Sequence, residues 1–79
     1  MSNVKEMHRK IFLNHVRANN HEAARFLDSF MADYSQYLAA RNSAKPQLAG
    51  ELIAELERKA DQVKALIAGG IVEIVEGAH

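Results

Sequence analysis

The sequence contains no cysteine, so disulfide bonds, thiolate metal ligands and cysteine nucleophiles are all excluded. A core built from only 79 residues provides about 3–5 kcal/mol unless something supplements it. Because neither a disulfide nor a recognisable metal site does so here, we expect the chain to self-associate. The lack of cysteine also suits a reducing cytoplasm, and residues 1–6 lack the charged-then-apolar pattern of a secretory signal. We therefore expect a cytoplasmic protein.

Long apolar runs are also missing, since none approaches the roughly 20 residues that a transmembrane helix needs. We expect no membrane association. Neither sign of charge is in excess, because ten Lys and Arg balance ten Asp and Glu, so the whole chain gives no electrostatic reason to bind nucleic acid. The charges are unevenly distributed, however: residues 1–25 hold five Lys and Arg against two Glu, a net charge of +3. The remainder carries −3.

Glycine and proline are absent from residues 3–41, where strong helix formers predominate and apolar residues recur at helical spacing. The turn formers of residues 42–45 precede the only proline, Pro46, which is tolerated in the first turn of a new helix. Gly69 and Gly70 end that helix. The pattern predicts an all-α fold, either an antiparallel helical hairpin or a short three-helix arrangement, dimerising into a helical bundle. The single domain of residues 1–79 has predicted helices over about 3–18, 20–42 and 46–68.

The junction between the first two predicted helices has two interpretations. In the first, Asn19 caps a new helix and Glu22 reaches back to it at capping-box spacing, so the chain breaks there. In the second, one helix of nearly 40 residues runs through, with Asn20 as a polar residue on its buried seam. The capping-box spacing favours the break.

The C-terminal tail is predicted to be extended over residues 71–76, because four of the five residues 71–75 are β-branched. Alternation would place Glu73 on the same side as Ile71 and Val75, so neither face is cleanly apolar. A single strand cannot satisfy its own backbone. We expect it to pair with its copy in a second subunit or to lie along a helical groove, with a frayed terminus as the alternative.

An antiparallel helix that ends near residue 68 reaches back only to about residue 20, because both helices rise by about 1.5 Å per residue. The apolar face of residues 4–16, which includes Leu13, is left uncovered. The first helix folding back, the tail or a second subunit could cover it, and a dimer with crossing helices satisfies all of these requirements together. The residues expected at a dimer or partner interface are Val4, Met7, Ile11, Phe12, Val16, Phe30, Met31, Ile71, Val72 and Ile74.

Motifs that carry chemistry are missing. His8, His15 and His21 are seven and six residues apart, so no two of them share a helical turn as metal ligands would. Phosphate-binding glycine motifs and recognisable catalytic triads are absent as well. We therefore predict no catalytic residues, no metal and no cofactor, and we do not expect an enzyme.

The sequence thus predicts a small non-enzymatic regulator, adaptor or inhibitor that acts as a helical homodimer and binds an unidentified larger protein. One alternative is a small nucleic-acid-binding protein that uses the basic first helix. Another is a structural component of a larger assembly, to which the tail would add a strand. The nucleic-acid contacts in the first alternative would be Lys5, Arg9, Lys10 and Arg17.

Overall fold

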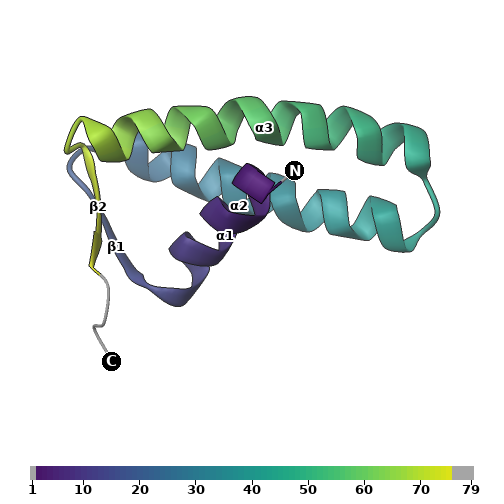
Figure 1. Ribbon diagram of the computed structural model, residues 1–79, viewed down its shortest axis with the longest axis horizontal. Helices are drawn as coiled ribbons and strands as arrows, with labels where there is room; N and C mark the ends of the chain where they lie inside the picture. Colours follow the sequence, from purple (N-terminus) through teal and green to yellow (C-terminus); the bar gives the residue numbers. More distant parts are fainter. Residues whose placement is uncertain (1, 76–79) are drawn as a thin grey trace.

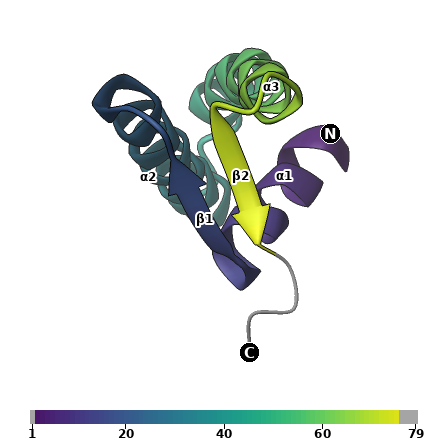
Figure 2. The same ribbon diagram turned by 90° about the vertical axis from the view of Figure 1, so that its left-hand side faces the viewer.

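A long antiparallel hairpin of two helices dominates the computed structural model, which describes residues 2–75 (Figure 1). A shorter helix packs against this hairpin, mainly on its second arm, and two short strands cover the end where the first arm begins and the second ends (Figure 2). The predicted helical fold is confirmed, but the chain is not all-α. In order, the elements are α1 (Ser2–Leu13), β1 (His15–Ala18), α2 (His21–Asn42), α3 (Pro46–Ala68) and β2 (Val72–Val75).

The hairpin turn lies where the sequence predicts it. At the end of α2, the Lys45 N–H donates to the Ala40 carbonyl at 3.0 Å and the Ala44 N–H donates to the Arg41 carbonyl at 3.2 Å. This pair of bonds is the Schellman motif, and it puts Ala44 in the left-handed region with φ of 55°. Pro46 then occupies the first turn of α3. The turn therefore satisfies the last carbonyls of α2 before the chain reverses.

The end of α3 repeats the motif with a glycine. Gly70 has φ of 78°, and its N–H donates to the Ile67 carbonyl at 3.1 Å. The Ile71 N–H donates to the Leu66 carbonyl at 3.0 Å. Because a left-handed residue turns the chain sharply away from the helix axis, Gly70 directs the tail back across the end of the hairpin.

The predicted end of the first helix at residue 18 is wrong, because α1 ends at Leu13 and residues 15–18 form β1. The predicted break is confirmed and the continuous helix is wrong. The cap is one residue later than predicted: the Asn20 side-chain oxygen accepts a hydrogen bond from the Ala23 N–H at 2.8 Å. Asn19 instead belongs to the strand connection, where its side-chain amide donates to the Gly70 carbonyl at 2.8 Å.

The tail pairs with β1 of its own chain, not with a second subunit or a helical groove. The strands are antiparallel, with His15 opposite Val75 and Arg17 opposite Glu73. One face of the sheet turns toward the helices, and the other turns toward solvent. The inner face carries Val16, Ala18, Val72 and Ile74, whereas His15, Arg17, Glu73 and Val75 are exposed. Residue 76, the last of the predicted tail, lies outside the described residues.

The core lies where α1, α2, α3 and the sheet meet. Four of the six large apolar residues between positions 4 and 16 are covered at least in part within the chain, because α1 folds back onto α3 and the tail pairs with β1. Val4 and Met7 are buried and Ile11 and Val16 are half-buried, whereas Phe12 and Leu13 are exposed. Two of the three predicted covers thus act together, and burial of these four residues does not require a second subunit. The homodimer stays a prediction. The largest fully buried side chains are Val4, Phe30, Leu56, Val63 and Val72.

The longest helices in the part of the chain that the structure describes are α2 and α3. Neither they nor α1 combine the length and hydropathy that a membrane span requires.

Candidate protein-interaction surface

The residues predicted to form an interface divide into three groups. Val4, Met7, Phe30 and Val72 are buried within the chain, so they have little surface to offer a partner. They are buried because α1 and β2 lie against the hairpin. A second group is half-buried beside the core: Ile11, Val16, Met31, Ile71 and Ile74. Only Phe12 is largely exposed, at 69% of its surface.

Phe12 has two exposed apolar neighbours, and we call Phe12, Leu13 and Val75 the apolar end. Leu13 is 59% exposed and is the last residue of α1. Val75 is at the end of β2, opposite His15, so all three lie at the end of the molecule where α1 turns into β1 (Figure 2). The interface prediction omitted Leu13 and Val75. Alternation along β2 could have identified Val75 as exposed. Side chains point alternately to the two faces of a strand, so residue 75 faces outward if Val72 faces inward.

Helical geometry explains why these side chains remain exposed. Val4, Met7 and Ile11 recur at intervals of three and four residues, so they share the face of α1 that packs against the core. Phe12 and Leu13 follow Ile11 by one and two residues, which turns them about 100° and 200° around the helix axis. They therefore point away from that face. Large apolar side chains exposed next to each other are typical of interaction sites.

The Phe12 ring also belongs to an aromatic stack. Its centroid lies 5.8 Å from that of His8, and the His8 ring lies 3.9 Å from Tyr34 of α2. The two ring pairs are nearly parallel, with interplanar angles of 11° and 19°. Partial burial in this stack lowers the pKa of His8 from its ordinary value of 6.5. The stack therefore connects the apolar end to α2 through a neutral imidazole at pH 7.

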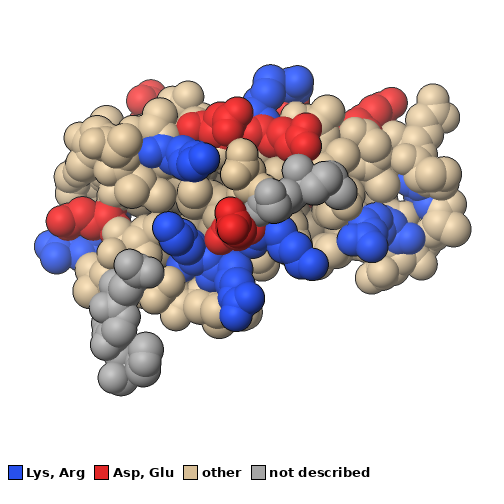
Figure 3. All heavy atoms as spheres, in the orientation of Figure 1, with Lys and Arg blue, Asp and Glu red and all other residues tan. Residues whose placement is uncertain are grey.

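The four predicted nucleic-acid contacts are all exposed, and three of them belong to α1. Lys5 and Arg9 are one turn apart, Lys10 follows, and Arg17 lies on the outer face of β1. None forms an ion pair with a carboxylate within residues 2–75. Figure 3 shows Lys and Arg gathered below the middle of this face, with acidic side chains along α3 above. The basic region of the sequence is thus also a basic surface.

Two of the grooves beside α3 are each lined by several charged side chains. The one between α1 and α3 has a volume of about 420 Å³. Asn3, Glu6, Met7, Arg9, Lys10, Leu13, Asn14 and Lys64 line it. It begins at the apolar end, because Leu13 belongs to both.

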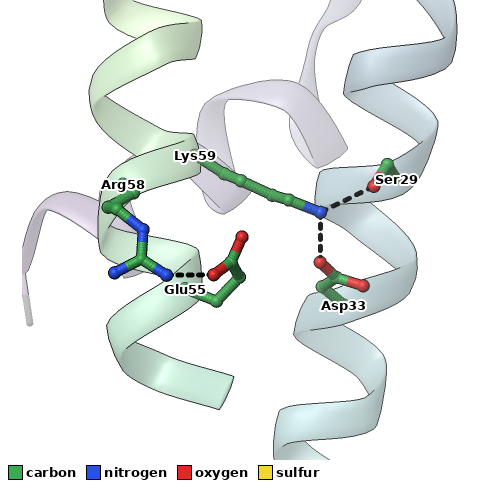
Figure 4. A network of polar contacts seen from close by, with 5 residues as sticks. All are labelled: Ser29, Asp33, Glu55, Arg58 and Lys59. Carbon is green, nitrogen blue, oxygen red and sulfur yellow. Dashed lines mark hydrogen bonds and ion pairs between the residues drawn. The ribbon is translucent and has the colours of Figure 1, made fainter. Parts of the chain in front are cut away.

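The groove between α2 and α3 has a volume of about 500 Å³, with Phe26, Leu66 and Ile71 among its apolar lining. Its two cations, Arg58 and Lys59, are already paired within the chain (Figure 4). The Lys59 ammonium donates to Ser29 Oγ at 2.7 Å and to Asp33 Oδ2 at 2.5 Å. Arg58 pairs with Glu55 along α3. The Lys59 contacts hold α2 against α3, and both cations of this groove are engaged within the chain.

The three histidines within residues 2–75 lie on different elements and do not form a cluster. His8 stacks on Tyr34, whereas His15 is exposed on the sheet and His21 is exposed at the start of α2. Within residues 2–75, no three His, Asp or Glu side chains are close enough to hold a metal ion.

No protein-family model matches the chain, and neither a curated protein nor a solved structure does. Its surface chemistry is therefore the basis for inferring its function.

Proposed function

We propose that this protein is a small non-enzymatic regulator, adaptor or inhibitor that binds a larger protein through its apolar end. The observation that carries the proposal is the exposure of Phe12 and Leu13, 69% and 59%, at adjacent positions of α1. Removing a large apolar side chain from water contributes roughly 1.5–3 kcal/mol, so this pair favours a complex that covers them. An aromatic side chain at the centre of such a surface is a common energetic anchor of protein interfaces.

The test compares partner capture by the wild-type chain with capture by the Phe12→Ser and Leu13→Ser variants. The control is Leu48→Ser, since Leu48 is 43% exposed but lies in the first turn of α3, at the other end of the hairpin. We expect Phe12→Ser and Leu13→Ser to lose the captured protein and Leu48→Ser to retain it. Circular dichroism checks that each variant remains helical. Equal capture by all three variants would contradict the proposal.

The homodimer is the second part of the proposal. Its support is the small size of the chain, because a core this small is commonly supplemented by association. Sedimentation velocity over a range of concentrations tests it. A wild-type chain that remains monomeric at every concentration would exclude it. The cytoplasmic location expected from the sequence also remains a prediction.

Nucleic-acid binding is the alternative that the exposed cations of α1 favour. A site built on Lys5, Arg9, Lys10 and Arg17 would lose affinity steeply as the salt concentration rises, because bound counterions are released from the phosphates. An interface centred on Phe12 and Leu13 would be less sensitive to salt. A salt titration of the captured complex therefore discriminates between the two functions.

A further inference from the structure

One flank of α1 and one residue of α3 form the walls of the groove between these helices. Glu6, Lys10 and Leu13 recur at intervals of four and three residues, so they lie along the same side of α1. Lys64 stands on the opposite wall, on α3. Met7, which is buried, contributes to the lining between them. Charged walls and an apolar lining therefore coexist in one groove.

The charges of this groove are unbalanced. Arg9, Lys10 and Lys64 are three cations, and Glu6 is the single carboxylate among the lining residues. None of the three cations forms an ion pair with a carboxylate in the described part of the chain. In the other groove, by contrast, Arg58 and Lys59 are both paired. The groove between α1 and α3 thus has cations available for a ligand.

The exposed apolar side chain of the groove is that of Leu13. It is 59% exposed, and Asn14 next to it donates from its side-chain amide to the Lys10 carbonyl at 3.0 Å. That bond satisfies one of the last carbonyls of α1 and holds the helix end in place. A ligand that matches this surface carries negative charges beside an apolar group.

We propose that this groove binds an acidic segment of the partner protein, with carboxylates near Lys10 and Lys64 and an apolar side chain against Leu13. The proposal rests on the proposed function and specifies the chemistry of the partner. Complementary charge at the rim of an apolar contact gives orientation and specificity. The segment's carboxylates would compensate cations that the chain itself leaves unpaired.

Two other occupants fit the groove less well. A nucleic-acid backbone would meet the Glu6 carboxylate and an exposed Leu13, and the chain has no net positive charge to attract a polyanion. Within residues 2–75, a second copy offers exposed carboxylates singly beside an exposed apolar side chain, as Glu51 lies beside Leu48 and Glu73 beside Val75. Either carboxylate alone would leave two of the three cations unmatched. An acidic segment matches both the charges and the apolar contact.

The experiment uses the full chain and short fluorescein-labelled peptides, with binding followed by fluorescence anisotropy. The first peptide contains Glu, Leu and Ser, the second has Lys in place of Glu, and the third has Ser in place of Leu. Labelled single-stranded DNA is the fourth probe. We expect the wild-type chain to bind the first peptide more tightly than the other three probes.

The charge-reversed variant K10E/K64E provides the sharpest test. We expect it to bind the Glu peptide about threefold to tenfold more weakly, because two exposed charge contacts become repulsive. It should also bind the Lys peptide better than the wild type does. The matched control is R25E/K45E, which reverses two exposed cations outside the groove and changes the net charge by the same amount. It should change neither affinity. A nonspecific electrostatic effect would weaken binding by R25E/K45E as much as by K10E/K64E.

Three results would overturn the proposal. They are equal affinity of the wild type for the Glu and Lys peptides, tighter binding of the DNA, and concentration-dependent self-association that K10E/K64E abolishes. Partner capture separates this inference from the function on which it rests. If K10E/K64E captures the same protein as the wild type whereas Leu13→Ser does not, the acidic segment is wrong and the protein-binding function stands.

Discussion

The imidazole of His8 stacks on the phenol ring of Tyr34, with ring centroids 3.9 Å apart and an interplanar angle of 19°. His8 belongs to α1, whereas Tyr34 is a buried residue of α2, so the pair joins the short helix to the first arm of the hairpin. Most of the packing of α1 is on α3. The stack thus adds a contact with α2 and helps to fix the position of α1, and of Phe12, on the hairpin.

Stability should depend on the protonation of His8. Partial burial lowers its pKa below 6.5, so the unfolded chain binds this proton more readily than the folded chain does. The contribution is fully present above pH 6.5 and is lost as the pH falls from 6.5 toward the lower pKa of the folded state. Urea unfolding of the wild type and His8→Phe, which keeps a ring at the stack, measures the effect. The difference in unfolding free energy between the two should change in favour of His8→Phe as the pH falls.

If the unfolding free energies of the wild type and His8→Phe change in parallel between pH 7 and 5, His8 does not carry the effect. NMR titration of the His8 ring protons gives its pKa directly, and a value above 6.5 would contradict the burial argument.

Replacing Gly70 and Gly50 with alanine should change the unfolding free energy in opposite directions. Gly70→Ala introduces a side chain at φ of 78° and should lower the unfolding free energy by about 1 kcal/mol. Gly50 lies inside α3, and a methyl group there would meet no atom within 4 Å. Gly50→Ala should therefore raise the unfolding free energy by roughly 0.5–1 kcal/mol. Urea denaturation of both variants measures the pair, and a change of the same sign in both would be inconsistent with the turn geometry.

The hairpin could be predicted because its signals are local. Apolar residues recur at helical spacing through α2 and α3, and Pro46 and Gly69 mark boundaries that the structure reproduces. Strand β1 could not be predicted in this way. Its four residues also continue the helical pattern of α1, and their strand partner begins at Val72, more than 50 positions away. A strand this short is stabilised by its pairing and not by its own sequence.

The candidate site, like the fold, could be predicted only in part. The sequence identified the apolar residues of α1, but periodicity alone does not show which of them the rest of the chain covers. Val4 and Met7 are buried because α1 folds back onto α3, whereas Phe12 remains exposed. The grooves could not be foreseen, since Lys10 and Lys64 become neighbours only through that packing.

The two consecutive asparagines should differ in their contribution to stability. Asn20→Ala removes the side-chain oxygen that accepts the Ala23 N–H, and loss of such a cap costs about 1 kcal/mol. Asn20→Asp keeps an acceptor and should remain near the wild type. Asn19→Ala loses an exposed bond to the Gly70 carbonyl and should be less destabilising than Asn20→Ala. Thermal unfolding followed by circular dichroism ranks the three variants. If Asn19→Ala lost more stability than Asn20→Ala, the result would favour Asn19 as the helix cap, as predicted from the sequence.

Lys59 should matter more to stability than the adjacent Arg58. The Lys59 and Asp33 side chains are only 19% and 23% exposed, and Lys59→Met leaves that carboxylate partly buried without its cation. We expect a loss of about 1–3 kcal/mol in the unfolding free energy. Arg58 is 70% exposed, so Arg58→Met should lose less than about 0.5 kcal/mol. A double-mutant cycle with Lys59→Met and Asp33→Asn isolates the pair, because the double variant should lose less than the two single changes added together. Additive losses would mean that Lys59 and Asp33 do not stabilise each other, and their contact would then be incidental to the stability of the hairpin.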